Sequence, residues 1–214
     1  MVLRIDFHVH TCYSSDGITT LREVVAYSKR RGLDGVAITD HNTVDGAQKL
    51  LGRTDLIIIP GVEVNALEGH VLALNVNSPI TQNLPFCKTV QRIHEAGCIA
   101  VAAHPFAPLK FTSWTNVTSD FDAIEVINAT ATPFSLSTYQ SRKLAARLNL
   151  PQIAGSDAHY GPEIGYAYTL VKADPDVADI VNSIKKGAVA PFGKAIPYSL
   201  RLRRTSLNLK KSFR

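Results

Sequence analysis

The sequence predicts an α/β fold in which the strands close into a barrel. Short apolar runs, typical of buried strands, alternate along the 214 residues with segments that carry helix caps or helical spacing. Seven or eight strands that alternate with helices in a chain of this length suit a closed barrel better than an open doubly wound sheet. No glycine-rich phosphate loop follows the first strand, which weakens the alternative of a dinucleotide-binding fold.

The predicted elements follow one another in a regular order. Apolar runs predict strands at residues 2–9, 35–39, 56–64, 70–76, 98–103, 122–127, 152–155, 167–171 and 188–192. Helical patterns lie between them at residues 20–31, 43–51, 89–96, 137–148 and 175–186. The first helix is the best marked, because Thr20 and Glu23 form a capping box and Gly32 follows its end.

Composition excludes several classes of protein. With 45% hydrophobic and 19% charged residues, the chain is typical of a folded globular domain. No apolar run approaches the roughly 20 residues that span a bilayer, and the first residues lack the layout of a signal peptide. Cys12, Cys87 and Cys98 are odd in number and scattered, so we expect no disulfide framework and a reducing, cytoplasmic location.

Most of the net charge of +5 lies near the C-terminal end. We therefore divide the chain into a nearly neutral barrel domain, residues 1–198, and a basic tail, residues 199–214. The tail contains no acid, and its charges are Arg201, Arg203, Arg204, Lys210, Lys211 and Arg214. Such a tail attracts polyanions, nucleic acid above all. The other interpretation is a solvated extension that aids solubility.

Side chains that bind metals recur at the ends of the predicted strands. His8 and His10 close the first strand on one face, because side chains alternate along a strand. The other donors, most of them at ends of later strands, are Asp16, His41, Glu63, His70, His104, Asp157 and His159. In a parallel barrel the carboxyl ends of the strands meet at one mouth, where active sites of this architecture lie. His70 begins its strand, so it needs a local reversal of the chain to reach that mouth.

These nine donors are too many for a single ion. Divalent metals take about four to six ligands each, so the set suits two or three ions, and mixed histidine and carboxylate sites accept Zn, Mn or Fe. A carboxylate such as Glu63 can bridge two ions, which a neutral histidine cannot do. Only His94, inside a predicted helix, is expected at the surface.

The motifs around these donors resemble those of the PHP (polymerase and histidinol phosphatase) superfamily. The resemblance covers roughly residues 3–171 and is carried by Asp6-Phe7-His8-Val9-His10-Thr11, Ser15-Asp16-Gly17, Ile38-Thr39-Asp40-His41-Asn42, Pro60-Gly61-Val62-Glu63, Gly69-His70, Ala103-His104-Pro105 and Gly155-Ser156-Asp157-Ala158-His159. It implies a distorted (β/α)7 TIM-like barrel, a trinuclear Zn, Mn or Fe site, and cleavage of phosphoesters. Suitable donors fill all nine metal-binding positions of the family.

The resemblance also implies a division of the ligands. By the family pattern, one ion is held by His8, His10, Glu63 and Asp157. A second site uses Asp16, His41 and His159, and a third uses Glu63, His70 and His104. We expect Glu63, Asp157 and His159 to act most directly in catalysis. Asp40 is expected to orient a ligand histidine, not to bind metal.

The substrate predicted from the resemblance is a nucleotide or a short nucleic acid. The compact spacing from Glu63 to His70 and the segment Glu125-Val126-Ile127-Asn128 are most similar to those of the small stand-alone phosphoesterases of the family, which implies hydrolysis by a metal-bridging hydroxide. Arg142 and Lys110 are candidates to bind the phosphate, since a guanidinium grips it at two points. Two alternatives stay open. One is a small-molecule phosphatase of the histidinol-phosphate type, and the other is a non-catalytic nucleic-acid-binding protein with structural metals.

Overall fold

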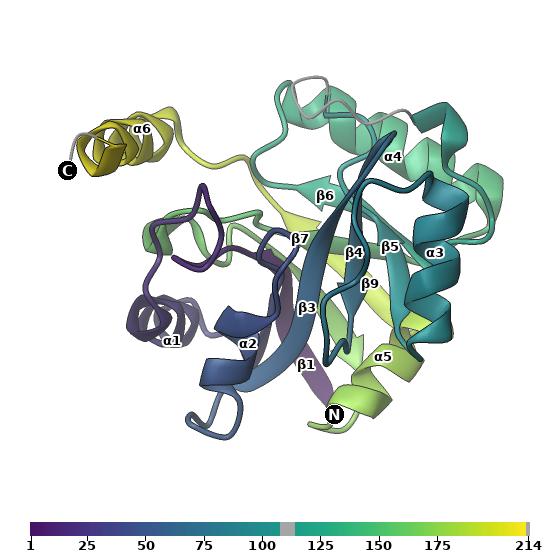
Figure 1. Cartoon of the computed structure of the whole chain (residues 1–214), viewed down its shortest axis with the longest axis horizontal. Coiled ribbons are helices and arrows are strands. Elements are labelled where there is room, and N and C mark those ends of the chain that lie inside the picture. Colours follow the sequence, from purple (N-terminus) through teal and green to yellow (C-terminus); the bar gives the residue numbers. More distant parts are fainter. Residues whose placement is uncertain (108–113, 213–214) are drawn as a thin grey trace.

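The predicted strands and helices are all present in the structure, a computed structural model that describes residues 1–107 and 114–212 (Figure 1). The strands are β1 (Val2–Val9), β2 (Gly35–Ile38), β3 (Ile57–Ala66), β4 (Gly69–Leu74), β5 (Ile99–Ala102), β6 (Ala123–Asn128), β7 (Gln152–Gly155), β8 (Ala167–Lys172) and β9 (Val189–Gly193). The α-helices are α1 (Leu21–Arg30), α2 (Asp45–Leu50), α3 (Phe86–Glu95), α4 (Phe134–Leu148), α5 (Val177–Lys185) and α6 (Tyr198–Ser212). The capping box at the start of α1 is confirmed.

The described strands form one mixed sheet in the order β7-β6-β5-β4-β3-β2-β1-β8-β9. The prediction of a parallel sheet is correct for β1 to β3 and for β5 to β7. It is wrong for β4, which runs antiparallel to β3 and β5, and for β8, which runs antiparallel to β1 and β9. Only Leu67 and Glu68 join β3 to β4, and a link this short permits only an antiparallel hairpin. The reversal places His70, at the start of β4, beside the ends of the parallel strands.

The sheet closes into a barrel between β7 and β1. At the beginning of β1, β8 occupies the seam, where the Thr169 hydroxyl lies 2.8 Å from the Ala154 nitrogen and 3.3 Å from its carbonyl oxygen. Toward the mouth, the segment after β7 pairs with β1 directly. The Asp157 N–H donates to the His8 carbonyl at 2.7 Å, and the His10 N–H donates to the Ala158 carbonyl at 2.9 Å. The predicted barrel is therefore present in a distorted form, with β8 and β9 in its seam.

Apolar side chains fill the barrel below the mouth. The interior cluster draws on most of the strands and includes Leu3, Ile5, Phe7, Ala37, Ile59, Leu72, Leu74, Val101, Ala123 and Ile153. Helix α5 adds Ile180 and Ile184 to this cluster, at the end of the barrel where β1 begins (Figure 1). Helices α1 and α2 cover one side of the barrel, and α3 and α4 cover the other. The polar donors are thus confined to the opposite end.

An irregularity in β1 turns the two histidines inward. Phe7 belongs to the interior cluster and Val9 to the outer cluster under α1 and α2. Strict alternation from Phe7 would therefore turn His8 outward, yet its ring contacts Glu63 inside the barrel. The pairing of β1 with β2 shifts register between Asp6 and Val9, and such a shift re-aims side chains locally.

The basic C-terminal residues form α6, for which the sequence pattern predicts no element. In Figure 1 this helix lies apart from the others, at the end of a linker that follows β9. Ile196 in the linker is buried, and its N–H donates to the Ala129 carbonyl at 2.9 Å. None of the helices in the described ranges has the length and apolar character needed to cross a membrane.

Candidate metal centre

The nine predicted donors lie together at the mouth of the barrel. They come from the ends of strands and from the loops that follow: His8 and His10 from β1, Asp16 from the next loop, His41 from the end of β2, Glu63 from β3, His70 from β4, His104 from the end of β5, and Asp157 and His159 from the segment after β7. Strand ends that lie far apart in the sequence thus supply one compact cluster.

Glu63 lies at the centre of this cluster and is buried. Its Oε2 lies 3.1 Å from His8 Nε2, 3.1 Å from His10 Nε2 and 3.5 Å from His41 Nε2, and its Oε1 lies 2.8 Å from His70 Nδ1 and 2.9 Å from His104 Nε2. One carboxylate therefore faces histidines on both of its oxygens, as a bridging ligand would.

A deep group of ligand atoms matches the first predicted ligand set. His8, His10, Glu63 and Asp157 are all buried, and one ligand atom from each lies within 4.8 Å of the others. Asp157 Oδ1 is 3.6 Å from His8 Nε2 and 3.4 Å from His10 Nε2. This set offers two imidazole nitrogens and two carboxylate oxygens to one ion.

A second group lies nearer to solvent. Asp16, His41 and His159 are joined there by His10, so the second predicted set gains one member. His159 Nε2 is 2.9 Å from Asp16 Oδ2, and His41 Nε2 is 3.6 Å from the same oxygen. The Nδ1 atom of His159 lies 2.9 Å from the Asp157 carbonyl, so this nitrogen holds the proton and Nε2 is left to bind an ion.

The members of the third predicted set, Glu63, His70 and His104, are divided between two groups of ligand atoms. Glu63 and His70 share a group with His41, whereas His104 groups with His8 and Glu125. His104 still lies 2.9 Å from Glu63, close to His70. The described geometry therefore brings all three together around Glu63 Oε1 and adds His41 on the other side.

Glu125 is a buried member of the site that the strand-end pattern missed. Its Oε1 lies 3.0 Å from His8 Nδ1, and its Oε2 accepts from the His104 backbone N–H at 2.9 Å and from Asn128 Nδ2 at 3.0 Å. This contact places the His8 proton on Nδ1 and frees Nε2 for a metal. Asp40, expected in such a role, instead accepts from the backbone N–H and hydroxyl of Thr11, at 2.6 and 2.7 Å.

The backbone around the ligands adopts conformations that side chains usually avoid. His104 and Asp157 both have positive φ, at 29° and 56°. Such conformations cost free energy and persist where the surrounding contacts enforce them, often at functional sites. Gly155 meets another steric limit, because a Cβ there would lie 2.3 Å from the His8 Cβ. His8 and Glu125 can approach β7 only because this side chain is absent.

The electrostatics of the centre fit divalent cations. Burial works against charge on Glu63, but His8 and His70 outweigh it and hold the pKa of Glu63 well below its usual range. Burial also opposes protonation of His10, but Asp157 and Glu63 reverse the effect and raise the pKa of His10 to about 9. The cluster thus attracts positive charge into a buried site. Neutral imidazoles and carboxylates are the ligands that Zn, Mn and Fe bind, so the residues fit such ions.

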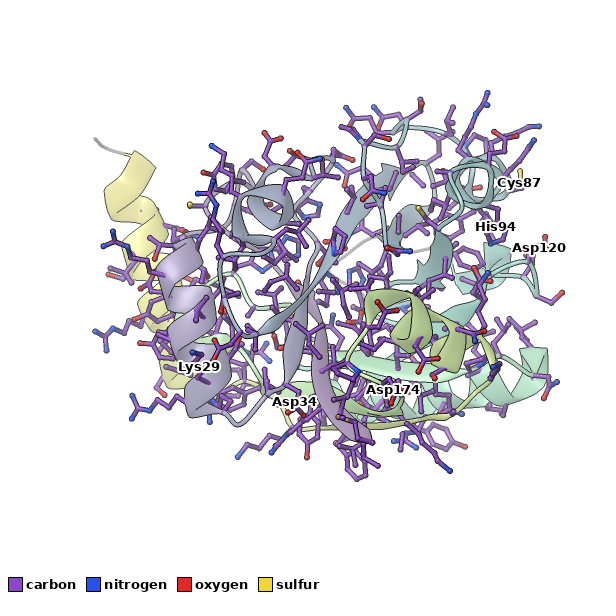
Figure 2. The ribbon with its side chains drawn as sticks, turned by 90° about the horizontal axis from the view of Figure 1, so that it is seen from below. Lys29, Asp34, Cys87, His94, Asp120 and Asp174 are labelled. Atoms are coloured by element: carbon purple, nitrogen blue, oxygen red, sulfur yellow. The ribbon has the colours of Figure 1, made fainter. Side chains whose placement is uncertain are left out.

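One of the two predicted phosphate contacts, Arg142, lies elsewhere. Arg142 is exposed on α4 and is not among the described residues that line the cavity beside the centre. Lys110 lies outside the described residues. His94 is exposed on α3, near Cys87 and Asp120 (Figure 2), and belongs to none of the ligand groups. Its Nε2 contacts Asp122 at 2.8 Å. The expectation that this histidine is a surface residue is confirmed.

A cavity of about 530 Å³ opens beside the outer group of ligands. Asp16 and His159 form part of its wall. Ala107, after β5, the β6–α4 loop and α6 form the rest, and the loop and the helix contribute Thr130, Ala131, Thr132, Arg201, Arg204, Thr205, Asn208 and Leu209. Arg201 and Arg204 are functional candidates that sequence reasoning missed, although their charge marked the segment. Besides this charge, the helical spacing of polar residues in the segment is a signal that could have placed them on one face of a helix.

A distorted α/β barrel whose mouth holds a cluster of histidines and carboxylates defines the class of metal-dependent barrel hydrolases. Comparison with known proteins shows which family within this class the chain resembles. The PHP domain matches residues 6–84, and the PHP-associated C-terminal region matches residues 137–189.

Three relatives illustrate the similarity. The uncharacterised protein MJ1587 of Methanocaldococcus jannaschii is 31% identical over 141 residues, which are 59% of this chain and 82% of that protein. A phosphoribosyl 1,2-cyclic phosphate 1,2-diphosphodiesterase of Eggerthella lenta is 31% identical over 99 residues, 42% of this chain and 37% of the enzyme. A two-domain protein of Bacteroides vulgatus with a PHP-like metal-dependent phosphoesterase superposes with a TM-score of 0.74 at 20% identity, over 91% of this chain and 65% of that one. The chain belongs to the PHP domain family.

Proposed function

We propose that this PHP-family metal-dependent phosphoesterase hydrolyses phosphoesters of nucleotides or short nucleic acids with two or three divalent ions, Zn, Mn or Fe. The observation that carries the proposal is the contact of Glu63 with five histidines, flanked by Asp157 and Asp16. Bound ions would supply Lewis acidity, which acidifies water and neutralises charge on the phosphoryl oxygens.

Three residues of the protein have distinct roles beside the bound ions. Glu63 and Asp157 hold the deep ligands in place and give the site its negative charge. His159 lies at the boundary between the centre and the cavity, where a substrate phosphate would arrive. Burial, with repulsion from His10, lowers the pKa of His159 to about 4, so its ring is neutral at neutral pH and able to bind an ion. We therefore propose Glu63, Asp157 and His159 as the catalytic residues.

The cavity supports a substrate of nucleotide size. A volume of about 530 Å³ lies within the range of small-molecule sites, and its wall combines threonine, asparagine and arginine side chains. The Eggerthella relative is named for a phosphoribosyl substrate, and a nucleotide shares that chemistry. Cys12, Cys87 and Cys98 are free thiols, which supports a reducing, cytoplasmic compartment as the proposed location.

The size of the cavity also favours a second candidate, a phosphatase for another small phosphomonoester. A screen of mononucleotides, histidinol phosphate and 5′-phosphorylated oligonucleotides with Mn²⁺ added separates the two. A preference for histidinol phosphate would favour the second candidate. The third interpretation, nucleic-acid binding without catalysis, predicts tight binding of oligonucleotides and no turnover of any compound.

The double substitution H8A/H10A tests the metal mechanism. We expect metal content to fall and phosphoester hydrolysis to drop at least about 1,000-fold, because two ligands of the deep group are lost. H94A is the matched control, since His94 is an exposed histidine outside the site. Full hydrolysis by the double variant would refute the mechanism.

A further inference from the structure

Two arginines of α6 bind segments of the barrel that contact metal ligands. The helix lies apart from the other helices, so its few contacts with the barrel determine its position (Figure 1). Arg201 and Arg204 lie three residues apart and therefore on the same side of the helix. Both are half-buried, whereas Arg203 between them is exposed. The two half-buried side chains make different contacts.

Arg201 anchors the helix to the β6–α4 loop. Its Nη1 donates to the Thr130 carbonyl and its Nη2 to the Ala129 carbonyl, both at 3.0 Å. Its Nε donates to the Ile196 carbonyl at 3.1 Å, so all three nitrogens of the guanidinium are in use. The Thr130 hydroxyl lies 2.7 Å from Asp157 Oδ2. The loop that Arg201 holds therefore contacts a ligand of the deep group.

Arg204 binds a buried carboxylate beside the outer group of ligands, the group that contains His159. Its Nη1 donates to Glu163 Oε2 at 2.9 Å. Glu163 belongs to the short 3₁₀ helix Gly161–Glu163, which follows His159 in the chain. The same Oε2 accepts from the His159 backbone N–H at 3.1 Å. One carboxylate oxygen therefore joins α6 to the backbone of a metal ligand.

Glu163 acts together with two other contacts to fix His159. The His159 carbonyl accepts from the Ile18 N–H at 2.9 Å, and its Nδ1 lies 2.9 Å from the Asp157 carbonyl. These bonds and the Glu163 contact hold both the backbone and the ring. In the resulting orientation Nε2 lies 2.9 Å from Asp16 Oδ2. The position of the nitrogen that is left to bind an ion thus depends on Glu163.

Glu163 in turn depends on Arg204 for its charge. Its side chain is fully buried, and an unpaired charge in such a place is costly. Among the described residues Arg204 is the only cation within 4 Å of it, and nothing there donates to its second oxygen, Oε1. Without Arg204, Glu163 would take up a proton or turn toward water. Either change weakens its hold on the His159 N–H, since a carboxylate accepts more strongly than a neutral carboxyl.

We propose that Arg204 is a positioning residue for the outer metal site. Through Glu163 it holds His159 in the conformation that binds an ion, so the docked helix α6 completes the outer group of ligands. The inference rests on the proposed function only for the presence of divalent ions. It makes one metal site depend on a helix that supplies none of the nine ligands.

Titration of the full chain with Mn²⁺ alone tests the proposal. We expect R204Q to lower the affinity for one ion about 10- to 100-fold, the range for contacts that orient a ligand histidine, and to leave binding by the deep group unchanged. R204K keeps a charge that can pair with Glu163 and should restore most of the affinity. R203Q removes the same charge from the exposed side of α6 and should bind Mn²⁺ like the wild type. Wild-type affinity in R204Q, or an equal loss in R203Q, would overturn the proposal.

A double variant tests the route through Glu163. E163Q also breaks the ion pair, so it should lower the affinity for the same ion. The variant R204Q/E163Q should then lose no more affinity than the weaker of the two single variants, because both substitutions interrupt one chain of contacts. Additive losses would overturn this route. Circular dichroism shows which variants are folded, and if R204Q is not, wild-type affinity in E163Q overturns the proposal instead.

Binding and hydrolysis separate this inference from the proposed function. If R204Q loses Mn²⁺ affinity as described and no phosphoester in the screen is hydrolysed, the proposed function fails and the positioning role stands. If phosphoesters are hydrolysed and R204Q binds Mn²⁺ like the wild type, the positioning role fails and the proposed function stands.

Discussion

Two buried carboxylates, Glu63 and Glu125, hold the histidines of the centre from opposite sides. Glu63 faces nitrogens that can bind ions, whereas Glu125 faces His8 Nδ1, the nitrogen turned away from the centre. Glu125 also accepts from the His104 backbone N–H, at a residue whose φ is positive. Glu125 thus determines which ring nitrogen of His8 carries the proton and also supports the backbone conformation of His104.

Replacement of Glu125 by glutamine should weaken metal binding without unfolding the chain. The amide keeps the shape of the side chain but lowers the basicity of His8, and such outer contacts are worth about 10- to 100-fold in metal affinity. Titration against a coloured chelator measures this loss. E95Q, on the exposed surface of α3, is the control and should bind metal like the wild type. Unchanged affinity in E125Q would show that Glu125 does not orient His8.

Replacement of Glu63 by glutamine should have the larger effect. Glu63 contacts five histidines, and every group of ligands contains at least one of them, so the loss of its charge affects the whole centre. We expect at least one ion fewer per chain by elemental analysis and a loss of hydrolysis of about 1,000-fold. Retention of the full metal content would contradict a bridging role.

At the scale of secondary structure elements, β7 must pass very close to β1. Ala at position 155 would place a methyl group 2.3 Å from the His8 Cβ and 2.7 Å from Glu125 Oε1. G155A should therefore destabilise the fold by about 1–3 kcal/mol, the usual cost of overpacking, and weaken metal binding. Urea unfolding and metal titration measure the two effects.

G32A is the control for this substitution. Gly32 has a φ of +66° and open space around it, so alanine there carries a backbone cost but leaves the metal centre intact. Metal affinity should fall in G155A only. A similar loss of affinity in both variants would rule out steric contact with His8 as the cause.

The elements of the barrel follow from local patterns, and the deviations follow from contacts between distant residues. Alternating apolar runs and the Thr20 capping box predict strands and helices because these signals are local. Glu125 escapes the strand-end pattern because it lies within β6, and its direction depends on the shape of the closed barrel. Helix α6 is not predicted because contacts with distant residues hold this charged segment in place: Arg201 binds carbonyls about 70 residues away in the sequence, and Arg204 pairs with Glu163.

At the scale of the whole molecule, metal loading should stabilise the fold and compete with protons. In the metal-free chain the pKa of His10 is raised from 6.5 to about 9, so its protonation stabilises the fold fully below pH 6.5. That stabilisation disappears as the pH rises through 9, whereas metal binding requires the neutral ring and strengthens over the same range. The difference in Tm between Mn²⁺-loaded and metal-free protein should therefore grow from pH 6.5 to pH 9. A difference in Tm that shrinks over this range would contradict the assignment of His10 as a metal ligand.

The pairing of the segment after β7 with the end of β1 has a consequence for biosynthesis. His8 and His10 leave the ribosome before the other ligands, and Asp157 and His159 follow only after about 150 further residues. The hydrogen bonds of Asp157 and Ala158 with β1 then unite the earliest and latest ligands. An ion therefore finds its complete set of partners only after the segment that follows β7 has been synthesised, so capture of the metal comes late in the folding of this domain.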